Sequence, residues 1–206
     1  MKGAQASGSQ TGKEQGGQKG REDSSRTSEK SDKQGGRKKS GGETVDGFHE
    51  LYVTALKDLY SAETQLLEAL PKMAKAASSP ELTKAFKGHL EVTKGQVQRL
   101  ETIFQELGEE PGGHECKAMR GLIEEADEII EEVKSGPLLD AAMITAAQKV
   151  EHYEISGYGS ARTFAQQLGE DYAVELLQAT LDEESEADEL LSEIALSTIN
   201  LEAAAV

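Results

Sequence analysis

Hydrophobic residues recur at steps of three and four along the chain beyond Gly47, which is the spacing of one face of an α-helix. Ala, Leu, Glu, Lys and Gln dominate this part, and clusters of β-branched residues bounded by turns are absent. Pro and Gly interrupt the pattern at intervals. It therefore predicts long helices over residues 46–77, 79–107, 138–168 and 170–200, and a shorter amphipathic helix from Met119 to Val133.

Four helices of roughly 30 residues, paired as two hairpins, favour an up-down bundle of ~45 Å. The short helix lies in the long connection between the second and third long helices, which lets these two run parallel. We predict an all-α fold, a ferritin-like four-helix bundle with an additional short helix in this crossover. Gly157 and Gly159 are predicted to allow close helix packing. The apolar face at Ile129, Ile130 and Val133 is a candidate for covering a dimer partner.

The N-terminal segment differs sharply from the rest of the chain. Residues 1–42 hold ten Lys and Arg against five Asp and Glu, which leaves −21 on the rest of the chain for a total of −16. Hardly any apolar side chain occurs there, so the segment cannot bury enough surface to offset chain entropy. We predict a disordered, weakly basic, low-complexity tail over residues 1–43 and a bundle domain over residues 44–203.

The composition excludes several classes of protein. No apolar run is long enough to span a bilayer, and the N-terminus lacks the hydrophobic segment of a secretory signal. We therefore expect a cytoplasmic protein without membrane contact. The single cysteine, Cys116, has no partner for an internal disulfide and is expected to be an inert packed thiol. No Gly-rich phosphate loop, nucleophile elbow or Ser/His/Asp grouping occurs.

Acidic residues interrupt the apolar stripes that should face the core. A buried carboxylate is costly unless it is protonated, paired with a base or bound to a cation. The alternatives to a metal are hydrogen bonds to Tyr60, Tyr153 and Tyr158, or pairing with a base such as Lys149. Glu183, Glu186 and Glu189 are expected to lie on a solvated face. The inward acids are Glu63, Glu151, Glu154, Glu184 and Asp188.

Several segments resemble the YciE/YciF ferritin-like proteins, and the likeness spans about residues 48–200. These segments are Asp58–Glu63, His89–Gln96, Gly121–Ala126, Ala147–Ile155 and Thr180–Glu184. The resemblance implies a ferritin-like bundle with an extra short helix, a homodimer, a link to bacterial stress responses and a di-metal centre.

The wider ferritin-like superfamily places one Glu on each of two helices and Glu-x-x-His on each of the other two. This chain departs from that pattern, since Ala187 stands where His is expected and Thr93 and Gln96 replace Glu and His. An oxygen-rich set of this kind suits Mn, Fe(II), Mg or Ca. The ligand set carried over is Glu63, Glu151, Glu154, Glu184, Asp188 and His89, with Gln96, Thr93 and His152 as supporting residues around two Fe or Mn ions.

The leading hypothesis is a stress-associated ferritin-like protein that handles iron, oxygen or peroxide at this site. As an enzyme, it would be a di-iron or di-manganese oxidoreductase of the rubrerythrin or ferroxidase type. The alternative is a metal-free helical interaction protein of the stress response. A third hypothesis lets the basic tail contact nucleic acid.

Overall fold

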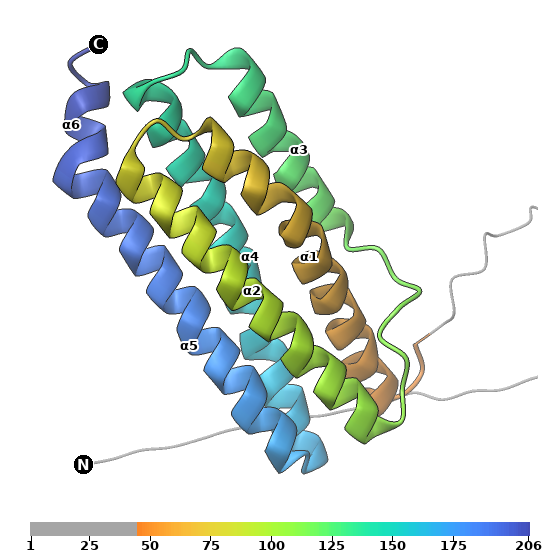
Figure 1. The fold of residues 1–206 in the computed structure, drawn as a ribbon. Coiled ribbons are helices and arrows are strands. Elements are labelled where there is room, and N and C mark those ends of the chain that lie inside the picture. The colour runs from red at the N-terminus through yellow and green to blue at the C-terminus, as the bar shows by residue number, and fades with distance from the viewer. Residues whose placement is uncertain (1–44) are drawn as a thin grey trace, which may run out of the picture. The chain divides into compact units, whose positions relative to one another are not determined.

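The computed structural model describes residues 45–206, and this part of the chain contains helices and no strand (Figure 1). The predicted tail of residues 1–43 lies outside the described residues. The helices are α1 (Phe48–Ala76), α2 (Pro80–Leu107), α3 (Lys117–Glu132), α4 (Pro137–Leu168), α5 (Asp171–Ile194) and α6 (Asn200–Ala203), with the π-helical segment η1 (Ala195–Ile199) between α5 and α6.

Local signals in the sequence account for most helix ends. The Ser79 side chain accepts a hydrogen bond from the Leu82 amide at the start of α2, where Pro80 occupies the first turn. Gly108 and Gly169 end α2 and α4 with positive φ values of 69° and 80°, which glycine adopts without steric cost. The four helices α1 to α4 therefore begin and end within about two residues of the predicted positions, as expected where caps are clear.

The fourth long helix differs from the prediction of one continuous helix over residues 170–200. Regular α-helix ends at Ile194, and the wider π turn of η1 follows before α6. Ala195 and Ile199 remain buried across this turn, whereas Leu196 is 75% exposed. A π turn inserts extra backbone without changing residue type, so the 3.6-residue pattern does not reveal it.

The long helices form antiparallel neighbours. Glu63 contacts Tyr158 while Ser78 contacts Asp140, so α4 descends as α1 ascends. α2 pairs with α5 in the same antiparallel sense, and α3 lies outside, against α1 and α4 (Figure 1). Because α1 and α2 also form a hairpin, α2 and α4 run parallel. The predicted bundle with its extra helix in the crossover is confirmed.

Helix α3 buries its own apolar face. Ile129, Ile130 and Val133 are partly buried and pack against the core of the same chain. These side chains stay partly accessible, so the suggestion that this face covers a dimer partner stays a prediction. An amphipathic stripe shows that a face is covered, and only the tertiary packing shows which surface covers it.

One of the two glycines predicted to allow close packing does so. A Cβ atom at Gly157 would lie 2.8 Å from Cδ2 of the buried Leu59 on α1, which is too short for carbon atoms. A Cβ atom at Gly159 would meet nothing within 4 Å, so that part of the prediction is wrong. The two residues differ because only Gly157 faces α1.

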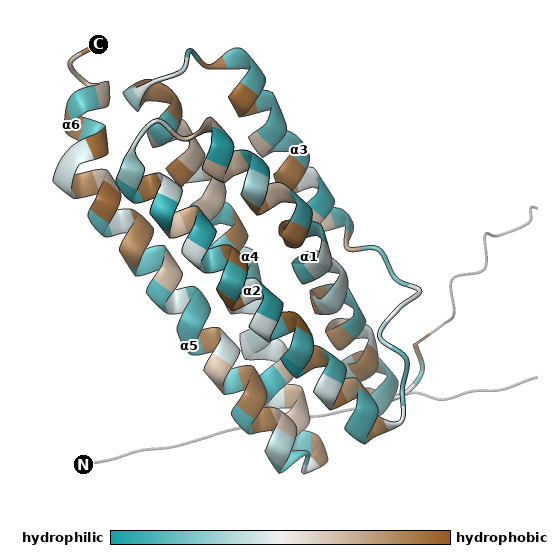
Figure 2. Ribbon diagram, viewed as in Figure 1, coloured by the Kyte–Doolittle hydropathy of each residue, from teal (hydrophilic) through white to brown (hydrophobic). Residues whose placement is uncertain are grey.

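The core consists of two apolar clusters separated along the bundle by a polar layer. One cluster includes Leu66 and Val150, and the other includes Leu59 and Leu177. Figure 2 shows hydrophobic residues recurring along each helix in place of continuous apolar runs. The polar layer consists of the buried side chains Glu63, Thr93, Gln96, Glu151, Glu154 and Glu184.

No helix within residues 45–206 combines the length and the apolar character required to cross a membrane.

Candidate metal centre

Four side chains of types that can bind a metal meet in the polar layer, and they come from three helices. His89 comes from α2, Glu151 and Glu154 from α4, and Glu184 from α5. One ligand atom from each lies within 4.8 Å of those of the other three. Three carboxylates and one imidazole so placed have the donor types that Fe(II) and Mn(II) accept. We call these four residues together with Glu63 the acid cluster.

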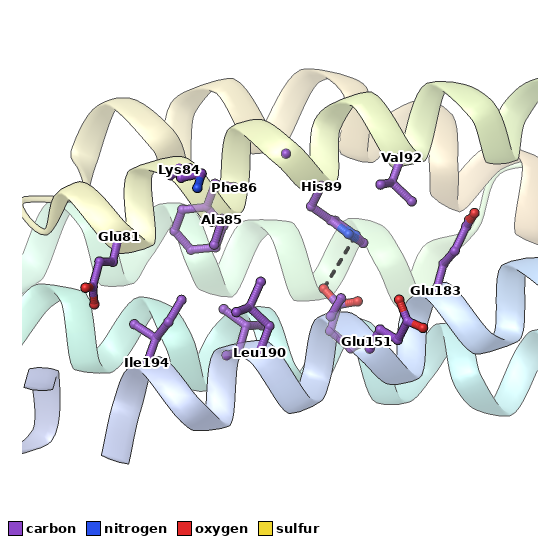
Figure 3. Close-up of a pocket in the computed structure, with 14 residues that line it drawn as sticks. Glu81, Lys84, Ala85, Phe86, His89, Val92, Glu151, Glu183, Leu190 and Ile194 are labelled. Atoms are coloured by element: carbon purple, nitrogen blue, oxygen red, sulfur yellow. Dashed lines mark ion pairs between the residues drawn. The ribbon is translucent and has the colours of Figure 1, made fainter. Parts of the chain in front are cut away.

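His89 lies at one edge of the acid cluster. Its Nε2 atom is 3.6 Å from Glu151 Oε1 and 3.6 Å from Glu184 Oε2, and Figure 3 shows the imidazole directed at Glu151. Both distances exceed the usual range of a direct hydrogen bond. The imidazole is therefore close enough to share a ligand with both carboxylates but is bonded to neither.

The acid cluster holds an unusual number of polar atoms without partners. Buried polar atoms in proteins are nearly always hydrogen-bonded, because an unpaired one loses its solvation without compensation. Within residues 45–206, no protein hydrogen-bond partner reaches Glu63 Oε2, His89 Nε2, Glu151 Oε2, Glu184 Oε2 or either carboxylate oxygen of Glu154. These six atoms come from all five residues of the cluster, so they mark its interior as a place for a cation.

Glu63 joins the cluster from α1 and is held by a tyrosine. The Tyr158 hydroxyl donates a hydrogen bond to Glu63 Oε1, and both side chains are fully buried. The other oxygen, Oε2, remains free. One carboxylate oxygen is thus fixed by α4 while its twin is available as a ligand, which is how an outer hydrogen bond orients a metal ligand.

Gln96 does the same for Glu184. The Gln96 amide donates to Glu184 Oε1 and to Glu183 Oε2, the latter at 3.1 Å. Glu183 in turn accepts two hydrogen bonds of 2.6 Å from Arg99, one on each oxygen. A paired guanidinium thereby anchors the amide that positions a buried carboxylate. The prediction of Gln96 as a supporting residue agrees with this placement.

Burial dominates the protonation of the carboxyl groups in the metal-free protein. It raises the pKa of Glu151 from 4.5 to about 8. The pKa values of Glu63, Glu154 and Glu184 also lie well above 4.5, first because of burial and then because the neighbouring acids repel one another's charge. Burial also lowers the pKa of His89. Near neutral pH the cluster holds protons, which a cation would displace.

Three other predicted site residues have different surroundings. Asp188 is half-buried, accepts a 2.9 Å hydrogen bond from Gln148 and lies 3.4 Å from His152, outside the group of four close donors. His152 is itself 69% exposed. The Thr93 hydroxyl is buried but donates to the His89 carbonyl of its own helix. Lys149, the base considered as a partner, pairs with the exposed Glu125 at 2.7 Å.

Two functional side chains were not singled out from the sequence. Glu183 was assigned to a solvated face, but it is half-buried and bound by Arg99. Arg99 lies three residues after Gln96 on α2, a spacing that places both on one side of the helix. This spacing could have indicated that Arg99 supports Gln96. It points to Glu183 as the partner of Arg99 only once α5 is known to pack against α2.

Cys116 behaves as the sequence predicts. The side chain is fully buried, and burial raises the pKa of its thiol. Its sulfur lies 2.9 Å from the Tyr153 hydroxyl and 3.3 Å from Asp58 Oδ2. These contacts fasten the loop before α3 to α1 and α4, which is a structural role.

Solved structures of similar proteins share this fold. The crystal structure of the stress protein YciF from E. coli matches with a TM-score of 0.73 and 44% identity, over 76% of this chain and 99% of that one. A protein from Rhodopseudomonas palustris, whose description proposes a structural role, matches with a TM-score of 0.70 and 41% identity, over 71% and 94%. A Xanthomonas campestris protein at 20% identity and a TM-score of 0.61, over 78% and 100%, shares the fold alone.

Sequence comparisons agree with the structural ones. Protein YciF from E. coli strain K12 is 45% identical over 157 residues, which cover 76% of this chain and 95% of that protein. The model of the family described as "Domain of unknown function (DUF892)" matches residues 47–204. This span includes α1 to α6 and therefore every member of the acid cluster. The chain belongs to the DUF892 family.

Proposed function

We propose that this protein is a stress-associated metalloprotein that binds two Fe or Mn ions in the acid cluster and handles iron, oxygen or peroxide there. The observation that supports it best is the set of six buried ligand atoms without hydrogen-bond partners. The E. coli relative is described as a stress protein, and at 45% identity we extend that association to this chain. We also propose that the protein acts in the cytoplasm.

The residues fit a pair of cations by their chemistry. Four acids that are at most 3% exposed cannot all ionise in an empty site, whereas two divalent ions would compensate four negative charges. Three donors plus His89 form one compact group, and Glu63 offers a further free oxygen beside Glu154. Bound Fe would supply electrons by changing between Fe(II) and Fe(III) and would polarise a bound oxygen or peroxide.

The side chains of this chain have separate tasks in that chemistry. Glu63, Glu151, Glu154 and Glu184 would hold the cations, and they give up their protons as the cations enter. His89 would add the single nitrogen ligand at the edge of the cluster.

The neighbours of these ligands fix their orientation. The Tyr158 hydroxyl orients Glu63, and Gln96 orients Glu184 from the opposite side. The apolar clusters above and below the polar layer exclude water from both ends.

Metal content is the direct test. The full chain would be purified from iron-supplemented cells, loaded anaerobically with Fe(II) and analysed for elements. We expect about two ions per chain, the number that two-metal sites bind. Glu63→Gln and Glu154→Gln should each lower this number, because glutamine keeps the size but not the charge. Glu189→Gln, at an exposed position on α5, is the matched control and should leave it unchanged.

The measured metal content has two opposite consequences for the proposal. Absence of specifically bound Fe or Mn under all loading conditions would overturn it. If two ions are bound, consumption of oxygen or hydrogen peroxide by the Fe(II) protein is the next measurement, and it asks whether the site is an oxidoreductase centre.

A second candidate function is a metal-free helical protein that acts by binding partners. Thr93 and Ala187 replace expected ligands, and the Thr93 hydroxyl is already satisfied within its own helix. The description of the R. palustris relative points the same way. If this function is correct, Glu63→Gln and Glu184→Gln will raise the melting temperature without changing the metal content, because the acids would then only destabilise the core.

A further inference from the structure

A groove between α2 and α5 leads from the surface to the acid cluster. Its volume is about 570 Å³, within the range of roughly 300–1,000 Å³ that is usual for small-molecule sites. Figure 3 shows its two walls, with Phe86 on α2 facing Leu190 and Ile194 on α5. The apolar side chains that line it include Phe86, Val92, Ala187, Leu190, Leu191 and Ile194.

The groove reaches the acid cluster from one side. His89 and Glu151 both line it, whereas Glu63 and Glu154 do not. His89 Nε2 and Glu151 Oε2 are buried polar atoms without protein partners within residues 45–206. An apolar groove that converges on two unpaired polar atoms has the features of a ligand site.

Ala187 helps to make the groove. The superfamily pattern places a histidine at this position, and a ring there would occupy space that the groove now includes. The small side chain of Ala187 leaves this space open beside His89, which lines the same groove.

The size of the groove argues for an organic ligand. A water molecule takes up ~30 Å³ of liquid, so oxygen or hydrogen peroxide would fill only a small part of the available volume. Hydrogen peroxide is polar and gains nothing from apolar walls, and apolar dioxygen is too small to cover them. A hydrocarbon chain would fill the space and displace water from both walls.

The charged side chains select the head group. Glu81 and Glu186 line the groove with Lys84 as the opposite charge, while Arg99 pairs with Glu183. Because the head group would also lie beside Glu151, a carboxylate would be repelled. A hydroxyl or hydroperoxyl group both donates and accepts a hydrogen bond, so in the metal-free protein it can pair with His89 Nε2 and Glu151 Oε2, the two unpaired atoms that the groove reaches. An alkylammonium, which only donates, is the competing head group beside these acids and is compared with the alcohol in the binding experiment.

We propose that the α2–α5 groove binds an uncharged single-chain alkyl compound with an oxygen head group, such as a long-chain alcohol or alkyl hydroperoxide, with that head group at His89 and Glu151. This deepens the proposed function, on which the choice of an oxygen head group rests. The hydrocarbon part of the site depends on the groove alone and is present in the metal-free protein.

A chain-length series tests the groove. Hexanol, octanol, decanol and dodecanol would be used to displace the fluorescent probe N-phenyl-1-naphthylamine from the full chain, once metal-free and once loaded with Mn(II). Affinity should rise roughly fourfold for each added methylene group while the chain lengthens inside the groove. It should level off when the chain outgrows the groove, which a flat apolar surface would not produce.

Two glycine variants on α2 make a matched pair. A Cβ atom at Gly88 or at Gly95 meets nothing within 4 Å, so an added side chain starts in open space at both positions. Gly88 lines the groove and Gly95 does not. Gly88→Leu should weaken decanol binding by about tenfold or more, as expected when a side chain competes for the same volume, and Gly95→Leu should not weaken it.

Three outcomes would overturn the proposal. Equal effects of the two leucine variants, or an affinity independent of chain length, would remove the groove as the site. Stronger binding of decanoic acid or decylamine than of decanol to the loaded protein would refute the head group. If Gly88→Leu instead converts a dimer into a monomer in sedimentation and no alcohol binds, the groove belongs to a second copy of the chain.

Failure of this inference can be separated from failure of the proposed function. Two bound metal ions together with no alcohol binding would reject only the ligand. Alcohol binding that follows chain length in a protein without any metal would reject the metal centre and leave the groove as a hydrocarbon site.

Discussion

Replacing Glu151 by Gln is expected to change how the stability of the metal-free protein depends on pH. Burial raises the pKa of Glu151 from 4.5 to about 8 in the folded protein, while in the unfolded chain it returns to the ordinary value. Below pH 4.5 both states carry the proton. As the pH rises toward 8 the unfolded chain ionises and the folded chain does not, so the free energy of unfolding falls.

The size of the effect follows from the two pKa values. Each pH unit between them costs roughly 1.4 kcal/mol, so the loss between pH 4.5 and about pH 8 is on the order of 4 to 5 kcal/mol. This is a large part of the ~5–15 kcal/mol that stabilises an ordinary domain. Glutamine has no charge to lose, and it should remove this contribution from the pH profile.

The assay is urea denaturation followed by far-ultraviolet circular dichroism across that pH range, in the presence of a chelator. The wild-type protein should lose stability toward alkaline pH more steeply than Glu151→Gln. The exposed Glu189→Gln variant should follow the wild type. Identical slopes for the wild type and Glu151→Gln would refute the reasoning, since they would mean that the carboxyl group titrates alike in both states. Added Mn(II) should restore the wild type at high pH, because the ions replace the lost protons.

Three further predictions concern packing, capping and ligand orientation. Gly159→Ala should stabilise the protein by up to ~1 kcal/mol through helix propensity, whereas Gly157→Ala should lack this gain because of Leu59; equal melting temperatures would contradict the close contact. Asp140→Ala should cost ~1–3 kcal/mol in urea denaturation, because the carboxylate accepts two backbone hydrogen bonds of 2.8 Å before α2; an unchanged midpoint would be evidence against this cap. Gln96→Leu should weaken metal binding about 10- to 100-fold in calorimetry without unfolding the protein, and unaltered affinity would remove it as a positioning residue.

The helices could be predicted because their signals are local. Turn residues such as Ser79, Gly108 and Gly169 act through their own backbone conformation and their near neighbours. The inward direction of Glu63 and Glu184 likewise follows from helical periodicity, since apolar residues recur on the same helix faces. These are Leu59, Leu66 and Leu67 around Glu63, and Leu177, Leu181 and Leu191 around Glu184. Both acids are fully buried in the structure.

Contacts between side chains on different helices could not be predicted from the sequence. Asp188 shares a helix face with Glu184 and lies one turn away, but α4 offers it Gln148 in place of the acid cluster. Glu183 has a charged sequence neighbourhood typical of a solvated face, yet Arg99 on α2 binds it. Both outcomes depend on how far one helix is shifted along another, and that shift is set by the packing of all the core side chains together.

The sequence by itself thus determined the all-α class, most helix ends and four of the five inward acids, because backbone propensity and periodicity act over a few residues. Only the tertiary structure decided that His89 joins Glu151, Glu154 and Glu184, that Tyr158 and Gln96 hold the carboxylates, and that a groove opens beside Ala187. Contacts between helices are long-range, and their geometry depends on interlocking side chains from several segments at once.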